Sequence, residues 1–182
     1  MPMLPTGMAD PARRGRDRGF SLIELLVVLA IVGVVTGAVV FSIHGSAERT
    51  VENAARRAAS RVGLACERAI LSGRDIGFTV VTDGLRFGYF ELDGWHPLAD
   101  NSSDELRARP LGQQLELTAL REGVELPLSD EPDSEPAFAC LSSGELTPFV
   151  LRIDRPDIAR PWVLEGRLDG QLDLAQISRE SL

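Results

Sequence analysis

The chain contains no lysine, because all 19 of its basic residues are arginine. Without a lysine amine it can form neither a lysine Schiff base nor a Walker-type phosphate loop. It has only two histidines and two cysteines, and their spacing suits no zinc site. A Gly-x-Ser-x-Gly nucleophile motif is also absent from the sequence. These absences exclude several enzyme classes, and we expect no catalysis, no cofactor and no bound metal.

Acidic residues outnumber basic ones by 27 to 19, which gives a net charge of -8. The first 19 residues hold four arginines and two aspartates, a net +2, so the chain beyond Gly19 carries -10. Proteins that bind nucleic acid rely on clustered cations. Towards the C-terminus the arginines alternate with aspartates and glutamates instead. We therefore expect no nucleic-acid partner.

One long apolar run follows a cluster of arginines at positions 13, 14, 16 and 18. From Phe20 to Ile43 its only acid is Glu24. As a helix this run would be about 36 Å long, enough to cross a hydrocarbon core of about 30 Å. The arginines that precede it predict a cytoplasmic leader and an exported domain after His44.

Glu24 separates three interpretations of this run. A carboxylate costs about 2.5–3.5 kcal/mol in the middle of a membrane helix and less near its end, so it usually has a function. A secretory signal peptide cut at Gly45-Ser46-Ala47 would have a shorter apolar core without an acid. A plain single-pass anchor accounts for the length and the orientation but leaves the acid unexplained.

The third interpretation comes from the order of residues Gly19-Phe20-Ser21-Leu22-Ile23-Glu24. This order resembles the leader junction of type IV pilins and of type II secretion pseudopilins. In that family a membrane-embedded prepilin peptidase cuts between the glycine and the phenylalanine and methylates the new amine. The resemblance implies cleavage between Gly19 and Phe20, and N-methylation of Phe20. It also implies that Glu24 pairs with the terminal amine of a neighbouring subunit during filament assembly.

The helix should continue beyond the apolar run. Small and apolar residues recur every three or four positions at Val51, Ala55, Ala58, Val62, Cys66 and Ala69. Ser72-Gly73 supplies a stop signal, so we predict one helix over Ser21–Leu71. Glu52 and Arg56 are placed to form an ion pair on its polar side.

Short strands at hairpin spacing follow the helix. They are expected at Ile76–Thr82, Leu85–Leu92, Gln114–Ala119, Val124–Leu128, Ala137–Leu141, Phe149–Ile153, Trp162–Leu168 and Gln171–Ala175. Asp100–Glu105 and Ser129–Pro136 are expected to be exposed loops. The fold class is α+β, with a long N-terminal helix, half membrane-spanning and half amphipathic, packed on an antiparallel β-sheet or sandwich in a pilin-like way. The domains are a leader at 1–19, a transmembrane half-helix at 20–43, an amphipathic half-helix at 44–72 and a periplasmic β domain at 73–182.

Several other residues could carry chemistry or bind a ligand, but each is better explained by a structural role. Cys66 and Cys140 could form a disulfide in an oxidising compartment, but two separate buried thiols are favoured. His44 should lie at the membrane boundary, and His96 in a loop beside Trp95. The acids at 130, 131, 133 and 135 suggest a solvated loop more than a calcium site. Gly33 and Gly37 permit close helix packing in lipid or simply soften the helix.

Two later stretches narrow the resemblance. Cys140-Leu141-Ser142-Ser143-Gly144-Glu145-Leu146-Thr147-Pro148-Phe149 and Gly73-Arg74-Asp75-Ile76-Gly77-Phe78 resemble the H-type minor pseudopilins of type II secretion. That family implies a structural subunit near the tip of a periplasmic pseudopilus that takes part in protein export across the outer membrane. The implied location is the inner membrane, single-pass, with a periplasmic C-terminal domain.

The implied partners are other minor and major pseudopilins, the prepilin peptidase, the inner-membrane assembly platform and membrane lipid. The alternative is a minor pilin of a type IV pilus, acting in pilus assembly or DNA uptake.

Overall fold

A computed structural model of the chain describes residues 20–99, 101–131 and 134–178, without the side chains of residues 38–46. It contains one long helix, α1 (Leu22–Ser72), which agrees with the expected Ser21–Leu71 to within one residue at each end. The helix ends where Gly73 adopts a φ of 65°, a left-handed conformation that favours glycine. The chain divides into two units, Met1–Val40 and Phe41–Leu182.

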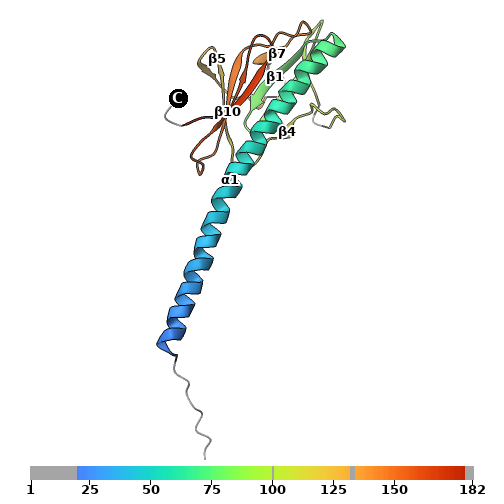
Figure 1. Cartoon of the computed structure of the whole chain (residues 1–182). Helices are drawn as coiled ribbons and strands as arrows, with labels where there is room; N and C mark the ends of the chain where they lie inside the picture. Colours follow the sequence, from blue (N-terminus) through green and yellow to red (C-terminus); the bar gives the residue numbers. More distant parts are fainter. Residues whose placement is uncertain (1–19, 100, 132–133, 179–182) are drawn as a thin grey trace, which may run out of the picture. The chain divides into compact units, whose positions relative to one another are not determined.

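In the second unit, the outer half of α1 packs along the β strands (Figure 1). The side chains on its inner face are small and fully buried: Val51, Ala54, Ala55, Ala58, Val62, Ala65 and Ala69. Small side chains let the helix backbone approach the sheets closely, which maximises van der Waals contact. On the outer face, Arg56 forms the expected ion pair with Glu52 at 2.8 Å.

In the part of the chain that the structure describes, ten strands form two antiparallel sheets, which confirms the predicted fold class. The first has the order β3-β2-β1-β7, with β4 paired to β2. Its strands are β1 (Ile76–Val81), β2 (Gly84–Glu91), β3 (Gly94–Pro97), β4 (Arg109–Pro110) and β7 (Phe138–Cys140). The second has the order β10-β9-β8-β5-β6. Its strands are β5 (Glu116–Arg121), β6 (Val124–Leu126), β8 (Phe149–Asp154), β9 (Trp162–Gly166) and β10 (Leu172–Gln176).

The strands β3 and β4 were not expected from the sequence. Trp95 and His96 lie in β3 and pair with Phe90 and Tyr89 of β2, so the assignment of His96 to a loop is wrong. The indole of Trp95 occupies space that a side chain on Gly88 would fill, because a Cβ there would lie 2.7 Å from the indole Nε1. This edge strand therefore depends on a tertiary fit that its own sequence pattern does not display.

Four phenylalanine rings form the centre of the core. Phe78, Phe87 and Phe138 come from the first sheet, and Phe149 from the second. Phe149 meets Phe78 edge-on, with ring centroids 5.4 Å apart, and lies 5.3 Å from Phe138. Since each such aromatic pair adds about 0.5–1.5 kcal/mol beyond simple burial, Phe149 is a principal link between the sheets.

A disulfide joins Cys66 of α1 to Cys140 of β7. The preference for two separate thiols is therefore wrong. The physical reason is that α1 packs directly against β7, which brings the two Cα atoms to 4.9 Å, within the range that a disulfide needs. The bond leaves no free thiol among the described residues.

The acidic stretch at 129–136 is anchored at one point. The carboxylate of Asp130 accepts hydrogen bonds from the Thr82 backbone N–H at 2.9 Å and from its hydroxyl at 2.6 Å. These bonds lower the pKa of Asp130. Arg86 donates to the carbonyl oxygens of Asp130 and Glu131. The expected loop is thus exposed but fastened to the β1–β2 hairpin, while residues 132 and 133 lie outside the described residues.

Candidate functional site

The first unit presents a continuous apolar surface. The large apolar side chains from Phe20 to Val35 are between 50% and 78% exposed. Water does not favour a contiguous apolar surface of this extent, which normally marks contact with lipid or another protein. This surface is the candidate functional site. We call it the assembly segment and define it as Phe20–Val35.

Glu24 lies in the first turn of α1 and is exposed. The Ser21 carbonyl accepts hydrogen bonds from the backbone N–H groups of Glu24 at 3.0 Å and Leu25 at 3.2 Å. Ser21 is therefore the N-cap residue, and Glu24 stands at the third helical position. Ser followed three residues later by Glu is the sequence of a capping box, and a carboxylate is also favourable near the positive end of the helix dipole.

Two physical roles are thus open to the same carboxylate. It can stabilise the start of its own helix, or it can neutralise a cation on another chain. Phe20 stands four residues before Glu24, about one turn or 6 Å along a helix axis. Both side chains are exposed, and Phe20 is 78% exposed. The geometry leaves both groups accessible to a neighbouring molecule.

Polar atoms within the assembly segment and just beyond it are few. Thr36 donates its hydroxyl to the Val32 carbonyl at 2.7 Å, so this hydroxyl needs no water molecule. A Cβ placed on Gly33 or Gly37 would meet nothing within 4 Å. Gly19 and the side chain of His44 lie outside the described residues, as do the side chains at 38–43 of the expected span.

Within the part of the chain that the structure describes, no helix is both long enough and apolar enough to cross a membrane.

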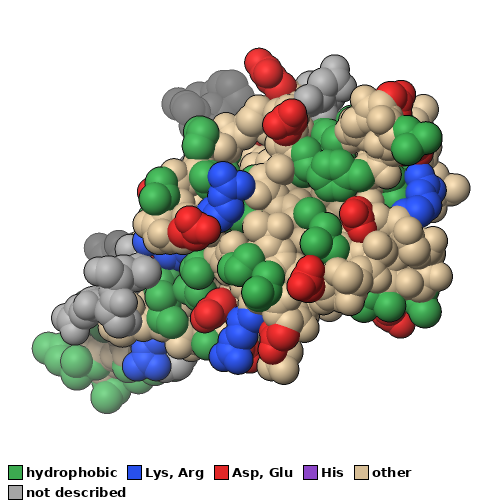
Figure 2. All heavy atoms as spheres, turned by 90° about the horizontal axis from the view of Figure 1, so that it is seen from above, with side chains coloured by type: hydrophobic (Ala, Val, Ile, Leu, Met, Phe, Trp, Pro, Cys, Tyr) green, Lys and Arg blue, Asp and Glu red, His purple; other side chains and the backbone are tan. Residues whose placement is uncertain are grey.

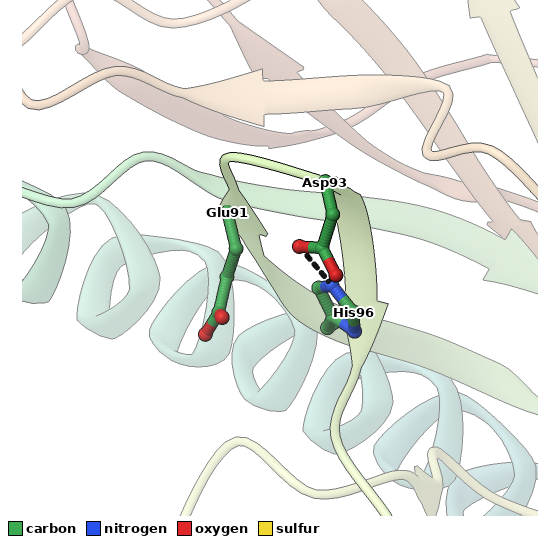
Figure 3. A group of neighbouring side chains, drawn as sticks. All are labelled: Glu91, Asp93 and His96. Carbon is green, nitrogen blue, oxygen red and sulfur yellow. Dashed lines mark hydrogen bonds and ion pairs between the residues drawn. The ribbon is translucent and has the colours of Figure 1, made fainter.

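A second cluster of polar side chains lies at the β2–β3 hairpin, where Glu91, Asp93 and His96 place ligand-type atoms within 4.8 Å of one another (Figure 3). This cluster was not predicted from the sequence. His96 Nε2 lies 2.8 Å from Asp93 Oδ1, and the contact raises the pKa of His96 and lowers that of Asp93. Arg74 forms an ion pair with Glu91 at 2.7 Å, and its guanidinium group lies over the ring of Tyr89. Each member has a partner in its own chain, so the cluster is best explained as support for an exposed hairpin.

The comparisons with known proteins agree with the assembly segment and the fold. Residues 14–40 match the model of the prokaryotic N-terminal methylation motif. The type II secretion system protein H of Pseudomonas aeruginosa is 33% identical over 148 residues, which cover 75% of this chain and 83% of that protein. The chain belongs to the type II secretion system protein H family. The family member from Vibrio cholerae is 28% identical over 183 residues, covering 86% of this chain and 93% of that protein.

Solved structures support the same family. A crystal structure of the minor pseudopilin EpsH from the type II secretion system of Vibrio cholerae matches with a TM-score of 0.57 and 27% identity. The match covers 70% of this chain and 96% of that chain. The solution structure of Escherichia coli GspH matches with a TM-score of 0.55 at 22% identity, which supports the fold alone. The predicted H-type minor pseudopilin with a pilin-like α+β fold is confirmed.

Proposed function

We propose that this protein is a structural subunit near the tip of a periplasmic pseudopilus and takes part there in protein export across the outer membrane. The proposal rests on the methylation motif at residues 14–40, which includes the exposed apolar assembly segment. An apolar segment of this kind can lie in lipid before assembly and among the helices of neighbouring subunits afterwards. The β domain then faces solvent and the other minor subunits.

The inner membrane is the proposed site of storage before assembly. The arginines of the leader place residues 1–19 in the cytoplasm, and residues 20–43 cross the membrane once. The amphipathic half-helix at 44–72 and the β domain at 73–182 are then periplasmic. An oxidising periplasm also suits the Cys66–Cys140 disulfide.

Processing is the proposed first step of assembly. The prepilin peptidase cuts between Gly19 and Phe20 and methylates the new amine on Phe20. The amine is a cation in an apolar setting, and Glu24 of a neighbouring subunit is the anion that compensates it. Each charge alone is costly to bury, and the pair offsets part of that cost in one relative position. Pairing therefore sets the position of one subunit against the next.

The remaining proposed partners are other minor and major pseudopilins, the inner-membrane assembly platform and membrane lipid. No catalytic role is proposed, because the chain acts as a substrate of the peptidase and as a filament component. The alternative, a type IV pilus minor pilin acting in DNA uptake, should present a continuous basic surface. On the face shown in Figure 2, arginines are interspersed with acidic and apolar side chains.

Replacement of Glu24 by alanine tests the proposal in a strain whose own gene for this protein has been deleted. We expect Glu24→Ala to be cut normally, because the residues on either side of the junction are unchanged. We expect it to enter filaments poorly and to restore little secretion. Glu48→Ala, which removes an exposed acid beyond the assembly segment, is the matched control and should restore secretion. Full secretion by Glu24→Ala would contradict the assembly role.

A further inference from the structure

A pocket of about 430 Å³ lies between the outer half of α1 and residues 105–111. Four arginines line it: Arg56, Arg57, Arg61 and Arg109. Among the described residues, Glu105 is the only acid that lines it. We call this site the arginine pocket. In a chain whose net charge is -8, such a concentration of positive charge is unusual.

The walls of the arginine pocket are fixed by hydrogen bonds from α1. Arg57 donates to the Leu111 carbonyl. Arg61 donates to the carbonyl oxygens of Leu106 at 3.0 Å and Arg109 at 3.2 Å, and also to that of Arg107. These guanidinium groups are therefore held in place rather than free to rotate in solvent. The pocket is preorganised, which reduces the entropy cost of binding.

Arg56 pairs with Glu52 at 2.8 Å, but the positive charge of the other three arginines of the pocket is incompletely neutralised. Carbonyl oxygens accept hydrogen bonds from Arg57 and Arg61 but carry no formal charge. Burial of Arg61, together with the nearby charge of Arg109, lowers the pKa of Arg61. Glu105 forms an ion pair at 3.4 Å with Arg68, which does not line the pocket. Among the described residues, neither a hydrogen bond nor an ion pair engages the Arg109 guanidinium, which is exposed.

We propose that the arginine pocket binds an acidic segment of another pseudopilin, through two or more neighbouring aspartate or glutamate side chains. Guanidinium groups match carboxylates through paired hydrogen bonds, which makes carboxylates suitable occupants. The volume lies within the ~300–1,000 Å³ typical of ligand clefts, so it accommodates a few side chains. The choice of a protein occupant rests on the filament role proposed above, since the neighbours of a filament subunit are proteins. The rest of the chain carries a net negative charge and repels an acidic segment. The arginine pocket therefore also determines where such a segment docks.

Peptide binding to the processed full-length chain in detergent tests this proposal. The probe is a tetraglutamate peptide with an uncharged fluorophore, and tetraglutamine is the control peptide. We expect tetraglutamate to bind and tetraglutamine not to bind. Arg109→Gln should reduce the affinity for tetraglutamate about tenfold, because one charge-assisted contact is lost. Arg56→Gln should weaken binding in the same direction. Arg160→Gln, an exposed arginine outside the pocket, is the matched control and should change affinity by less than about twofold.

Competition distinguishes the acidic segment from other anions. We expect neither inorganic phosphate nor a short single-stranded DNA, each equimolar with the peptide, to displace it. Displacement by phosphate would overturn the proposal in favour of a simple anion site, and displacement by DNA in favour of nucleic-acid binding. If Arg160→Gln weakened peptide binding as much as Arg109→Gln, the proposal would also be overturned, because the peptide would then be attracted by positive charge anywhere on the surface. Cleavage at Gly19 and the secretion defect of Glu24→Ala are independent of these outcomes, so the pocket and the filament role can fail separately.

Discussion

Reduction of the Cys66–Cys140 disulfide should strongly destabilise the β domain. The bond joins residues 74 positions apart, so it closes a long loop in the unfolded chain. The chain-entropy relation for a loop of this length gives about 4.5 kcal/mol of stabilisation at 25 °C. Native disulfides typically contribute about 2–5 kcal/mol, so the expected loss lies in the upper part of that range.

Urea unfolding of the purified chain, with and without dithiothreitol, measures this loss. With a urea dependence of about 2 kcal/mol per molar, a loss of about 4 kcal/mol lowers the unfolding midpoint by about 2 M. Reduction leaves both sulfur atoms in the protein, so the comparison changes little of the surrounding packing. The midpoint should fall while the slope changes only modestly.

The double variant Cys66→Ala, Cys140→Ala is the control for reduction. It should already be less stable than the oxidised chain, and dithiothreitol should not affect it further. A midpoint that falls by less than about 0.3 M in the reduced wild-type chain would refute the reasoning, since it corresponds to well under 1 kcal/mol. An equal effect of dithiothreitol on the double variant would show that the reagent acts elsewhere.

The remaining predictions concern the helix start, a close contact and a titrating pair. Glu24→Gln keeps a capping partner but removes the charge, so helix content by circular dichroism should be unchanged while secretion falls; normal secretion would favour the capping role alone. Gly166→Ala places a Cβ against a core phenylalanine ring and should cost about 1–3 kcal/mol in thermal unfolding. Gly63→Ala meets only ordinary contact and should instead stabilise the helix by about 0.5–1 kcal/mol. By NMR titration, the pKa of His96 should lie above its ordinary value and should fall in Asp93→Asn. Because the pKa of His96 is raised in the folded state, its contact with Asp93 stabilises the fold fully below the unfolded pKa of about 6.5. This contribution to stability is lost as the pH rises through the pKa of His96 in the folded protein.

Much of the fold could be predicted because its signals are local. The apolar run and the small-residue stripe define α1 along consecutive turns of one helix. Turn residues likewise mark the hairpins: Glu122 and Gly123 both adopt positive φ, as a two-residue hairpin requires. The cleavage junction at Gly19-Phe20 stays a prediction, which rests on residue order rather than on folding.

Features that depend on packing between distant segments could not be predicted in the same way. The disulfide requires α1 to lie against β7, and β3 requires room beside Gly88 for an indole ring. The arginine pocket joins residues such as Arg57 and Leu111, which are 54 positions apart. Arg56, Arg57 and Arg61 lie near one another on α1, but only the tertiary fold brings Arg109 beside them around one cavity.

The central claim is that cleavage frees an amine on Phe20, which is then methylated and which Glu24 of a neighbouring subunit neutralises. Intact-mass spectrometry of the protein from cells with and without the prepilin peptidase tests the processing step directly. The account predicts a methylated chain that begins at Phe20 when the peptidase is present and an uncut leader when it is absent. A mature chain that retains its leader in the presence of the peptidase, or that begins near Ala47, would contradict it.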